Sequence, residues 1–168
     1  MTAVDEAILL LRVALGLMIL AHGYNKIFGA GGLSGTAHWF AALGLQPAGL
    51  HARLAAATEI GVGVLLVVGL LTPAATAGLV GLMWVATRTD HRGKGPFVFQ
   101  GGWEYTAMIL VCAVTVGLVG PGRYSLDRLL GLPGGGLAWG LAGAAVGLIA
   151  GGTLLAACYR PNVSADNY

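Results

Sequence analysis

The segment from Arg12 to Lys26, RVALGLMILAHGYNK, decides the fold class, because it places charged side chains inside an apolar run. On a helix, His22 and Lys26 lie one turn apart on the same face. Arg12 and Lys26 are about 21 Å apart along the helix axis and about 40° apart around it. One helix face therefore carries cations near both boundaries of an apolar slab roughly 30 Å thick. An unpaired charge in hydrocarbon costs at least about 2.5 kcal/mol, so the rest of the chain must supply partners for these groups.

The composition is that of an integral membrane protein. Of the 168 residues, 57% are hydrophobic and 10% are charged, and the mean hydropathy is +0.80. A soluble domain carries about 25% charged residues. The 29 glycines suit close helix packing in lipid. Cys112 and Cys158 lie in apolar segments without a C-x-x-C motif, so we predict that they are packing residues and that the chain has neither a dithiol motif nor a metal site.

Five apolar segments predict five membrane-spanning helices, over residues 4–28, 50–71, 74–87, 103–119 and 137–159. We therefore expect an all-α membrane protein. Residues 1–131 would form a four-helix transmembrane bundle, and residues 132–168 would add a fifth C-terminal transmembrane helix and a short tail. Between the first two spans, residues 36–44 predict an interfacial helix, which Ser34 or Thr36 can cap and Gly44 can end.

The distribution of basic residues predicts the orientation. Short loops make neighbouring spans antiparallel, so the N-terminus shares a side with Arg123 and Arg128, together with Arg12 if its side chain extends to the surface. The opposite side holds Lys26, Arg53, Arg88, Arg92, Lys94 and Arg160. Because basic residues concentrate on the cytoplasmic side, we predict a multi-pass protein of a bacterial plasma membrane, with the N-terminus outside and the C-terminus inside.

The same topology brings five polar side chains to one membrane face: His22, Lys26, Glu59, His91 and Glu104. One interpretation is that they form interhelical ion pairs that lock the bundle, with Lys26 paired to Glu59 or Glu104, because polar groups inside membranes are normally satisfied. Another is a ligand site, in which histidine and a buried carboxyl group bind a quinone carbonyl and exchange protons. A proton or ion path would use the same residues. Haem is disfavoured, because it needs two histidines facing each other within the slab.

Two further features concern helix packing. At the other membrane face, Arg12 can meet Asp127, which follows a Gly-Pro-Gly turn, or Asp5 and Glu6 in its own helix; we prefer Asp127 and predict a structural ion pair. The last span carries a glycine face that permits close backbone approach and could serve the bundle, a homodimer or a larger complex. It consists of Gly143, Gly147 and Gly151.

An ordered set of residues between Leu11 and Gly131 carries a family resemblance: Leu11-Arg12, Gly16, His22-Gly23-x-x-Lys26, Gly44, Glu59, Gly69, His91, Glu104, Gly120-Pro-Gly122 and Ser125-x-Asp127. In a four-span frame, this set resembles the DoxX family of small bacterial membrane proteins. The resemblance implies a four-helix bundle shared with the DoxD-type subunit of thiosulfate:quinone oxidoreductase. It also implies membership of redox-related membrane complexes. The fifth span departs from the family pattern and could be a docking element.

The functional expectation is therefore a membrane subunit of a quinone-linked redox, respiratory or oxidative-defence complex. Such a subunit would need a partner carrying the redox centre, because the sequence shows no flavin, haem or iron–sulfur ligand set. The alternatives are a non-catalytic accessory subunit that docks through the fifth span, and a small transporter. We assign no catalytic residue and no tightly bound cofactor, with quinone as the candidate ligand. Expected partners are membrane lipid and other membrane subunits or a second copy, and not nucleic acid.

Overall fold

The computed structural model describes residues 3–161, which form an all-helical chain without a β-strand in that range. The helices are α1 (Ala3–Phe28), α2 (Gly32–Leu43), α3 (Ala48–Val68), α4 (Thr72–Thr89), the short 3-10 helix η1 (Val98–Gln100), α5 (Glu104–Val119), α6 (Leu126–Leu130) and α7 (Leu137–Cys158). The five apolar segments of the sequence coincide with α1, α3, α4, α5 and α7. The short helices η1 and α6 were not predicted from the sequence.

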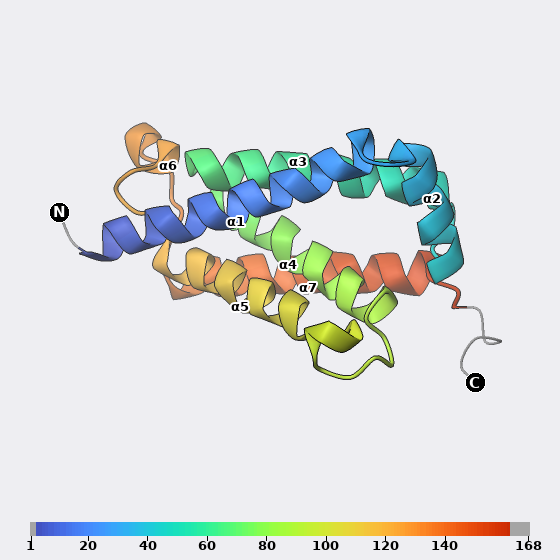
Figure 1. Cartoon of the computed structure of the whole chain (residues 1–168). Coiled ribbons are helices and arrows are strands. Elements are labelled where there is room, and N and C mark those ends of the chain that lie inside the picture. The colour runs from blue at the N-terminus through green and yellow to red at the C-terminus, as the bar shows by residue number, and fades with distance from the viewer. Residues whose placement is uncertain (1–2, 162–168) are drawn as a thin grey trace.

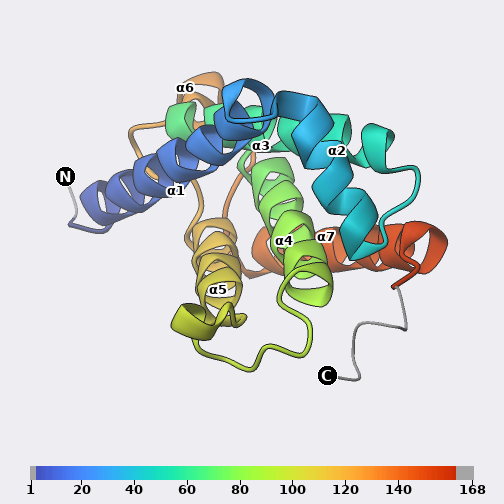
Figure 2. The ribbon, with the colours of Figure 1, turned by 45° about the vertical axis from the view of Figure 1, so that its right-hand side comes forward.

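The long helices form two groups that meet at α4 (Figures 1 and 2). Helix α1 packs along α3, with α2 covering one end of this pair, and helix α7 packs against both α4 and α5. Helix α4 contacts α3 on one side and α5 and α7 on the other. The N-terminus and α6 lie at one end of the molecule, which we call the α6 end, and α2 and the end of α7 lie at the other, the α2 end (Figure 1).

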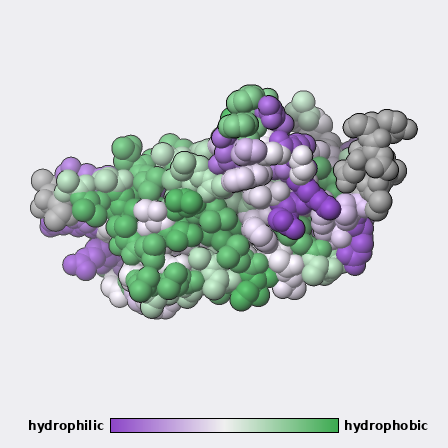
Figure 3. All heavy atoms as spheres, turned by 90° about the horizontal axis from the view of Figure 1, so that it is seen from below, coloured by the Kyte–Doolittle hydropathy of each residue, from purple (hydrophilic) through white to green (hydrophobic). Residues whose placement is uncertain are grey.

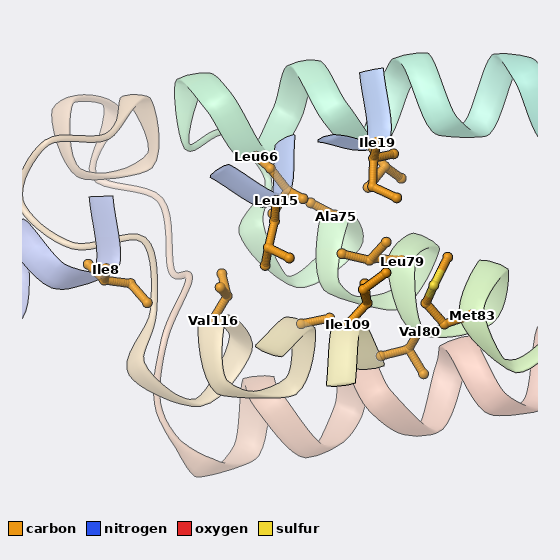
Figure 4. Packing of buried hydrophobic residues seen from close by; sticks show 12 residues of the cluster. Ile8, Leu15, Ile19, Leu66, Ala75, Leu79, Val80, Met83, Ile109 and Val116 are labelled. Carbon is orange, nitrogen blue, oxygen red and sulfur yellow. The ribbon is translucent and has the colours of Figure 1, made fainter. Parts of the chain in front are cut away.

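Apolar side chains from both groups fill the space between them (Figure 4). Ile19 of α1, Leu66 of α3, Leu79 and Val80 of α4, and Val116 of α5 are each at most 1% exposed. These side chains come from four helices, and their close packing supplies the van der Waals contacts that hold helices together in lipid, where apolar burial alone provides little driving force. The core therefore holds α1 and α3 against α4 and α5.

Helices α1 and α3 cross at two glycines. A Cβ atom added to Gly16 would lie 2.8 Å from the carbonyl oxygen of Gly63, and one added to Gly63 would lie 2.9 Å from the carbonyl oxygen of Gly16. Two turns further along α1, a Cβ atom at Gly23 would lie 3.1 Å from the Cβ atom of Glu59. The two backbones therefore approach closely, and this approach brings the end of α1 over Glu59.

The glycine face of α7 contacts helices of the same chain. A Cβ atom at Gly147 would lie 2.4 Å from the carbonyl oxygen of Ala77 in α4, and one at Gly151 would lie 3.1 Å from that of Gly81. Gly143 faces the carbonyl oxygen of Pro73 in the same way, at 3.0 Å. All three glycines are buried. The sequence left open whether this face serves the bundle, a homodimer or a larger complex, and the structure shows that it packs within the bundle.

Arg12 is fully buried near the α6 end of α1, with 0% exposure. Its Nη1 donates to the carbonyl oxygen of Leu66 at 2.7 Å, and its Nη2 donates to that of Tyr124 at 2.7 Å. Gly69 ends α3 with a left-handed φ of 67°, and a Cβ atom at this position would clash with the guanidinium group. Arg12 therefore ties α1 to the end of α3 and to the loop before α6.

Asp127 is also fully buried and accepts three hydrogen bonds at the start of α4. They come from the backbone N–H of Leu71 at 2.7 Å, the backbone N–H of Thr72 at 2.9 Å and the Oγ1 of Thr72 at 2.7 Å. The backbone N–H of Asp127 donates to the carbonyl oxygen of Gly69 at 2.9 Å. Asp127 thus supplies an acceptor for backbone N–H groups at the start of α4, which have no partner within the helix.

The predicted direct ion pair between Arg12 and Asp127 is not formed within residues 3–161, because no nitrogen–oxygen distance between them is within 4.0 Å. The two charges do attract each other, and both side chains act on the segment around Gly69. The two side chains do not meet because each is hydrogen-bonded to the backbone instead. The guanidinium group of Arg12 donates to carbonyl oxygens, and both carboxylate oxygens of Asp127 accept from N–H groups at the start of α4.

Helix α2 differs in its start from the prediction. It begins at Gly32 after a left-handed Gly31, and no side chain caps it. Thr36 lies inside the helix, where its hydroxyl group donates to the carbonyl oxygens of Gly32 and Lys26. The predicted end at Gly44 is confirmed, with a left-handed φ of 92°. The strand-like contact that follows, with Arg160 N donating to the Gly44 carbonyl oxygen at 2.7 Å, attaches the end of α7 to this loop.

The surface between the two ends is apolar. Seen from below, hydrophobic residues form a broad band across the molecule, with hydrophilic residues at both ends (Figure 3). Helices Ala48–Val68 and Leu137–Cys158 are long and apolar enough to cross a membrane, and Glu104–Val119 is a shorter apolar helix. A soluble protein would not expose so wide an apolar surface without a partner to cover it.

Candidate functional site

A cavity of about 520 Å³ lies at the α2 end, between the two groups of helices. Most of its lining residues are apolar, among them Trp39 and Phe40 of α2 and Leu154 of α7. Its volume falls in the range of cavities that bind small molecules, which combine apolar walls with a few polar groups. Four of the five residues of the predicted polar cluster line it: His22, Lys26, Glu59 and His91.

The main polar contact at the cavity is the ion pair of Lys26 and Glu59. The Lys26 Nζ lies 2.7 Å from Glu59 Oε1, and the two side chains are 13% and 8% exposed. The close approach of α1 to α3 at Gly23 explains the pair. Lys26 lies nearly one turn further along α1 and can therefore reach the carboxylate of Glu59 in the middle of α3. The charges are mostly withdrawn from solvent, so a second partner for each would offset part of their desolvation cost.

The second carboxylate oxygen of Glu59 lacks such a partner. Glu59 Oε2 is buried and accepts no hydrogen bond from any residue between 3 and 161. A buried polar atom without a hydrogen bond costs about 1–3 kcal/mol, and more when it is charged. Glu59 lines the cavity, and a bound molecule that reached this oxygen would supply its missing hydrogen bond. A carboxylate with one oxygen paired and the other free is a strong acceptor.

The histidines and a tyrosine add further polar groups. His91 Nδ1 lies 2.6 Å from the carbonyl oxygen of Gly101, which fixes the ring and leaves Nε2 4.0 Å from Asp90 Oδ2. His22 is exposed on α1, and its Nε2 lies 3.4 Å from the Tyr105 hydroxyl group. A polar molecule in the cavity would therefore meet hydrogen-bonding groups from α1, α3, α5 and the loop after α4.

Glu104, the fifth predicted member, does not line the cavity. It is exposed at the start of α5, and its Oε1 accepts a hydrogen bond from the backbone N–H of Val98 at 2.6 Å. The expectation that all five side chains share one pocket is corrected in this respect. The reason is local: the loop folds back as η1, and Glu104 binds the exposed N–H group of that turn.

Among the cavity residues that were not predicted are His51 and Tyr105. His51 is buried in α3, with its Nε2 3.2 Å from the Gln46 carbonyl oxygen. Its spacing of eight residues from Glu59 places both on one apolar stripe, and this spacing could have identified it. Tyr105 shows no comparable signal, because its role depends on how α5 lies beside α1. Within residues 3–161, no group of three or more His, Cys, Asp or Glu side chains is arranged to hold a metal ion.

Comparisons with known proteins give the family. The family model described as DoxX matches residues 7–92, which is about half of the chain. The inner membrane protein YqjF of Escherichia coli (strain K12) is 27% identical over 130 residues, covering 75% of this chain and 93% of that protein. No solved structure matches the chain significantly. With the all-helical fold and its apolar surface, these matches show that the chain is an integral membrane protein of the DoxX family.

Proposed function

We propose that this protein is the quinone-binding membrane subunit of a redox complex, and that the cavity at the α2 end holds the quinone head group. The observation that carries the proposal is the buried, unpartnered Oε2 of Glu59, a residue that lines an apolar cavity of about 520 Å³. A quinone couples an apolar ring and tail to two polar oxygens on opposite sides of the ring. The apolar walls and the few polar groups of the cavity fit that combination.

The polar groups suit both redox states of such a ligand. A quinol hydroxyl group would donate a hydrogen bond to Glu59 Oε2, and a quinone carbonyl oxygen would accept one from the Lys26 ammonium group, which has three hydrogens and gives one to Glu59 Oε1. Oxidation of the quinol releases two protons and two electrons. Glu59 and the nearby histidines carry the proton-accepting atoms that would receive these protons. The two electrons would pass to a partner subunit that carries a flavin or haem.

The alternative of a docking subunit needs a different surface of α7 from the one first considered. The face of Gly143, Gly147 and Gly151 is covered by α4, so a partner would have to bind the outer face instead. That face exposes Leu141, Val146 and Ile149, which are 55–68% exposed. Lipid covers such a face as well as a protein does, so the cavity supports the quinone proposal more directly than α7 supports docking.

The proposal predicts that Glu59→Gln lowers the affinity for a quinone or quinol by about 10- to 100-fold, because a hydrogen bond to a charged group contributes about 1.5–3 kcal/mol. The measurement is quinone retained by the purified protein in nanodiscs, quantified by mass spectrometry and titrated with a soluble short-chain quinone. Glu104→Gln is the matched control, because Glu104 lies at the same end but outside the cavity, and it should bind quinone as the wild type does.

A second variant separates loss of binding from loss of folding. Replacing the pair together, Lys26→Met with Glu59→Leu, exchanges a buried ion pair for apolar side chains of similar size, which is often neutral or stabilising. We expect this protein to fold and to bind no quinone. If Glu59→Gln and the double variant both fold and both retain quinone at the wild-type level, the site assignment is wrong. A loss of thermal stability with unchanged quinone content would favour a purely structural ion pair.

Purification from native membranes tests the complex. A quinone together with a flavin- or haem-carrying partner is the expected result. A stable heteromeric complex without quinone would favour the accessory subunit, and a single cofactor-free species active in vesicle flux assays would favour the transporter. Both results would contradict the proposal.

We further infer that α1, α3, α4, α5 and α7 cross the membrane, with the N-terminus outside and the α2 end in the cytoplasm. In a background with Cys112→Ala and Cys158→Ala, Gln100→Cys should react with a membrane-impermeant thiol reagent only after the cells are opened. Glu6→Cys, at the α6 end, should react in intact cells. Both positions are exposed in the structure. Reversed labelling of the two variants would reverse the orientation.

A further inference from the structure

A second cavity lies at the α6 end, opposite the proposed quinone site. Its volume is about 500 Å³, and it is lined by Asp5 of α1, by Arg128 of α6 and by residues of the loops on either side of α6. Gly134 and Gly135 form part of its wall, and a Cβ atom at Gly135 would lie 2.7 Å from the Cα atom of Gly120. The two loops are therefore held close together, and the wall they form presents backbone instead of side chains.

Two arginines give this cavity its charge. Arg123 and Arg128 both line it and both are exposed. Their backbone N–H groups donate to Asp5 and Ser125 respectively, and the Arg128 carbonyl oxygen accepts from the Gly131 N–H. Their guanidinium groups have no hydrogen-bond or ion-pair partner in the range 3–161. The Asp5 carboxylate also lines the cavity, and its Oδ1 accepts from the Arg123 N–H at 3.0 Å. Two guanidinium groups against one carboxylate leave the cavity with an excess of positive charge. Two free guanidinium groups facing one cavity make an anion site.

An apolar surface adjoins the arginines. In the segment of α6 and the following turn, Leu129 is 78% exposed, Leu130 is 61% exposed and Leu132, which also lines the cavity, is 39% exposed. Leucines at this exposure have no protein covering them within residues 3–161. Free phosphate would use the arginines alone, whereas a phospholipid would use the arginines for its head group and the leucines for its acyl chains.

We propose that this cavity binds the head group of an anionic phospholipid, with Arg123 and Arg128 on the phosphate and the leucines of the α6 segment against the acyl chains. The site is independent of the quinone cavity, because it lies at the opposite end of the bundle and shares no lining residue with it. It gives the α6 end a preference for membranes that contain anionic lipid, and it holds the loops around α6 at the membrane surface.

The test is lipid retention measured by native mass spectrometry. Purified protein is equilibrated with equimolar phosphatidylglycerol and phosphatidylcholine, and the ratio of retained lipids is determined. A hydrogen bond from a guanidinium group to a phosphate contributes about a tenfold gain in affinity, so the double variant Arg123→Gln, Arg128→Gln should lose at least about 10-fold of the selectivity for phosphatidylglycerol. The matched control is Arg92→Gln, Lys94→Gln, two exposed basic residues at the other end, which should keep the wild-type ratio.

The leucines distinguish lipid from free phosphate. Leu129→Ser with Leu130→Ser should weaken retention of phosphatidylglycerol, and inorganic phosphate in excess should displace little of it. Displacement by inorganic phosphate, together with no effect of the leucine variants, would overturn the assignment to lipid. An unchanged lipid ratio in the arginine variant, or an equal loss in the control, would overturn the site itself. Because all these side chains are exposed, size-exclusion chromatography should show wild-type folding throughout.

Discussion

Asp127→Ala is expected to lower the free energy of unfolding by about 3–5 kcal/mol, because three hydrogen bonds to a buried charged group are lost and each such bond contributes about 1.5–3 kcal/mol. Asp127 is 0% exposed and accepts three hydrogen bonds, two from Thr72 and one from the Leu71 N–H. An alanine would leave these donors buried without an acceptor. It would also remove the negative charge that attracts the fully buried Arg12. The measurement is unfolding in mixed detergent micelles, followed by intrinsic tryptophan fluorescence.

Two other variants make this prediction specific. Asp90→Ala removes a carboxylate whose side chain is 31% exposed and which lies 3.5 Å from Lys94; such a surface pair contributes about 0–1 kcal/mol, so stability should change little. Asp127→Asn keeps one acceptor oxygen but loses the charge. We expect its loss of stability to lie between the losses caused by Asp127→Ala and Asp90→Ala. Equal stability of Asp127→Ala and Asp90→Ala would show that the hydrogen bonds of Asp127 to the start of α4 do not stabilise the fold.

Gly147→Ala is the second substitution with a large expected effect, about 1–3 kcal/mol of destabilisation from overpacking. The added Cβ atom would lie 2.4 Å from the carbonyl oxygen of Ala77 and 2.9 Å from the Cβ atom of Val80. Both neighbours belong to helix α4, so α7 would have to move away from α4 to make room for the added Cβ atom. The same unfolding measurement applies, and limited proteolysis should show earlier cleavage near the start of α7.

Gly152 offers a matched control in the same helix. A Cβ atom at this position would meet nothing within 4 Å. Because alanine has a higher helix propensity than glycine by about 1 kcal/mol, Gly152→Ala should leave stability unchanged or raise it. The two substitutions are chemically identical, so opposite signs would locate the effect in the α4–α7 contact. A similar loss in both would mean that glycine flexibility, and not close packing, matters in α7.

The apolar runs of this chain determined its class and its long helices. A helix of about 20 apolar residues follows from the sequence, because every backbone group must be hydrogen-bonded inside lipid. The direction of successive helices then follows from short loops, which is why Lys26 and Glu59 could be assigned to one end. Gly44 was predictable as a helix end, because glycine readily adopts the left-handed conformation that its position requires.

The contacts between helices were decided by the tertiary structure. Lys26 reaches Glu59 because α1 and α3 cross at Gly16 and Gly63, and no sequence pattern specifies that crossing. Glu104, only one residue before the cavity residue Tyr105, turns instead to the N–H of Val98. Sequence periodicity gives the face of one helix, whereas a site between helices depends on their relative rotation and separation. Those are set by close packing of the whole core. The sequence therefore left Lys26 with two candidate partners, Glu59 and Glu104, and the tertiary structure decided for Glu59.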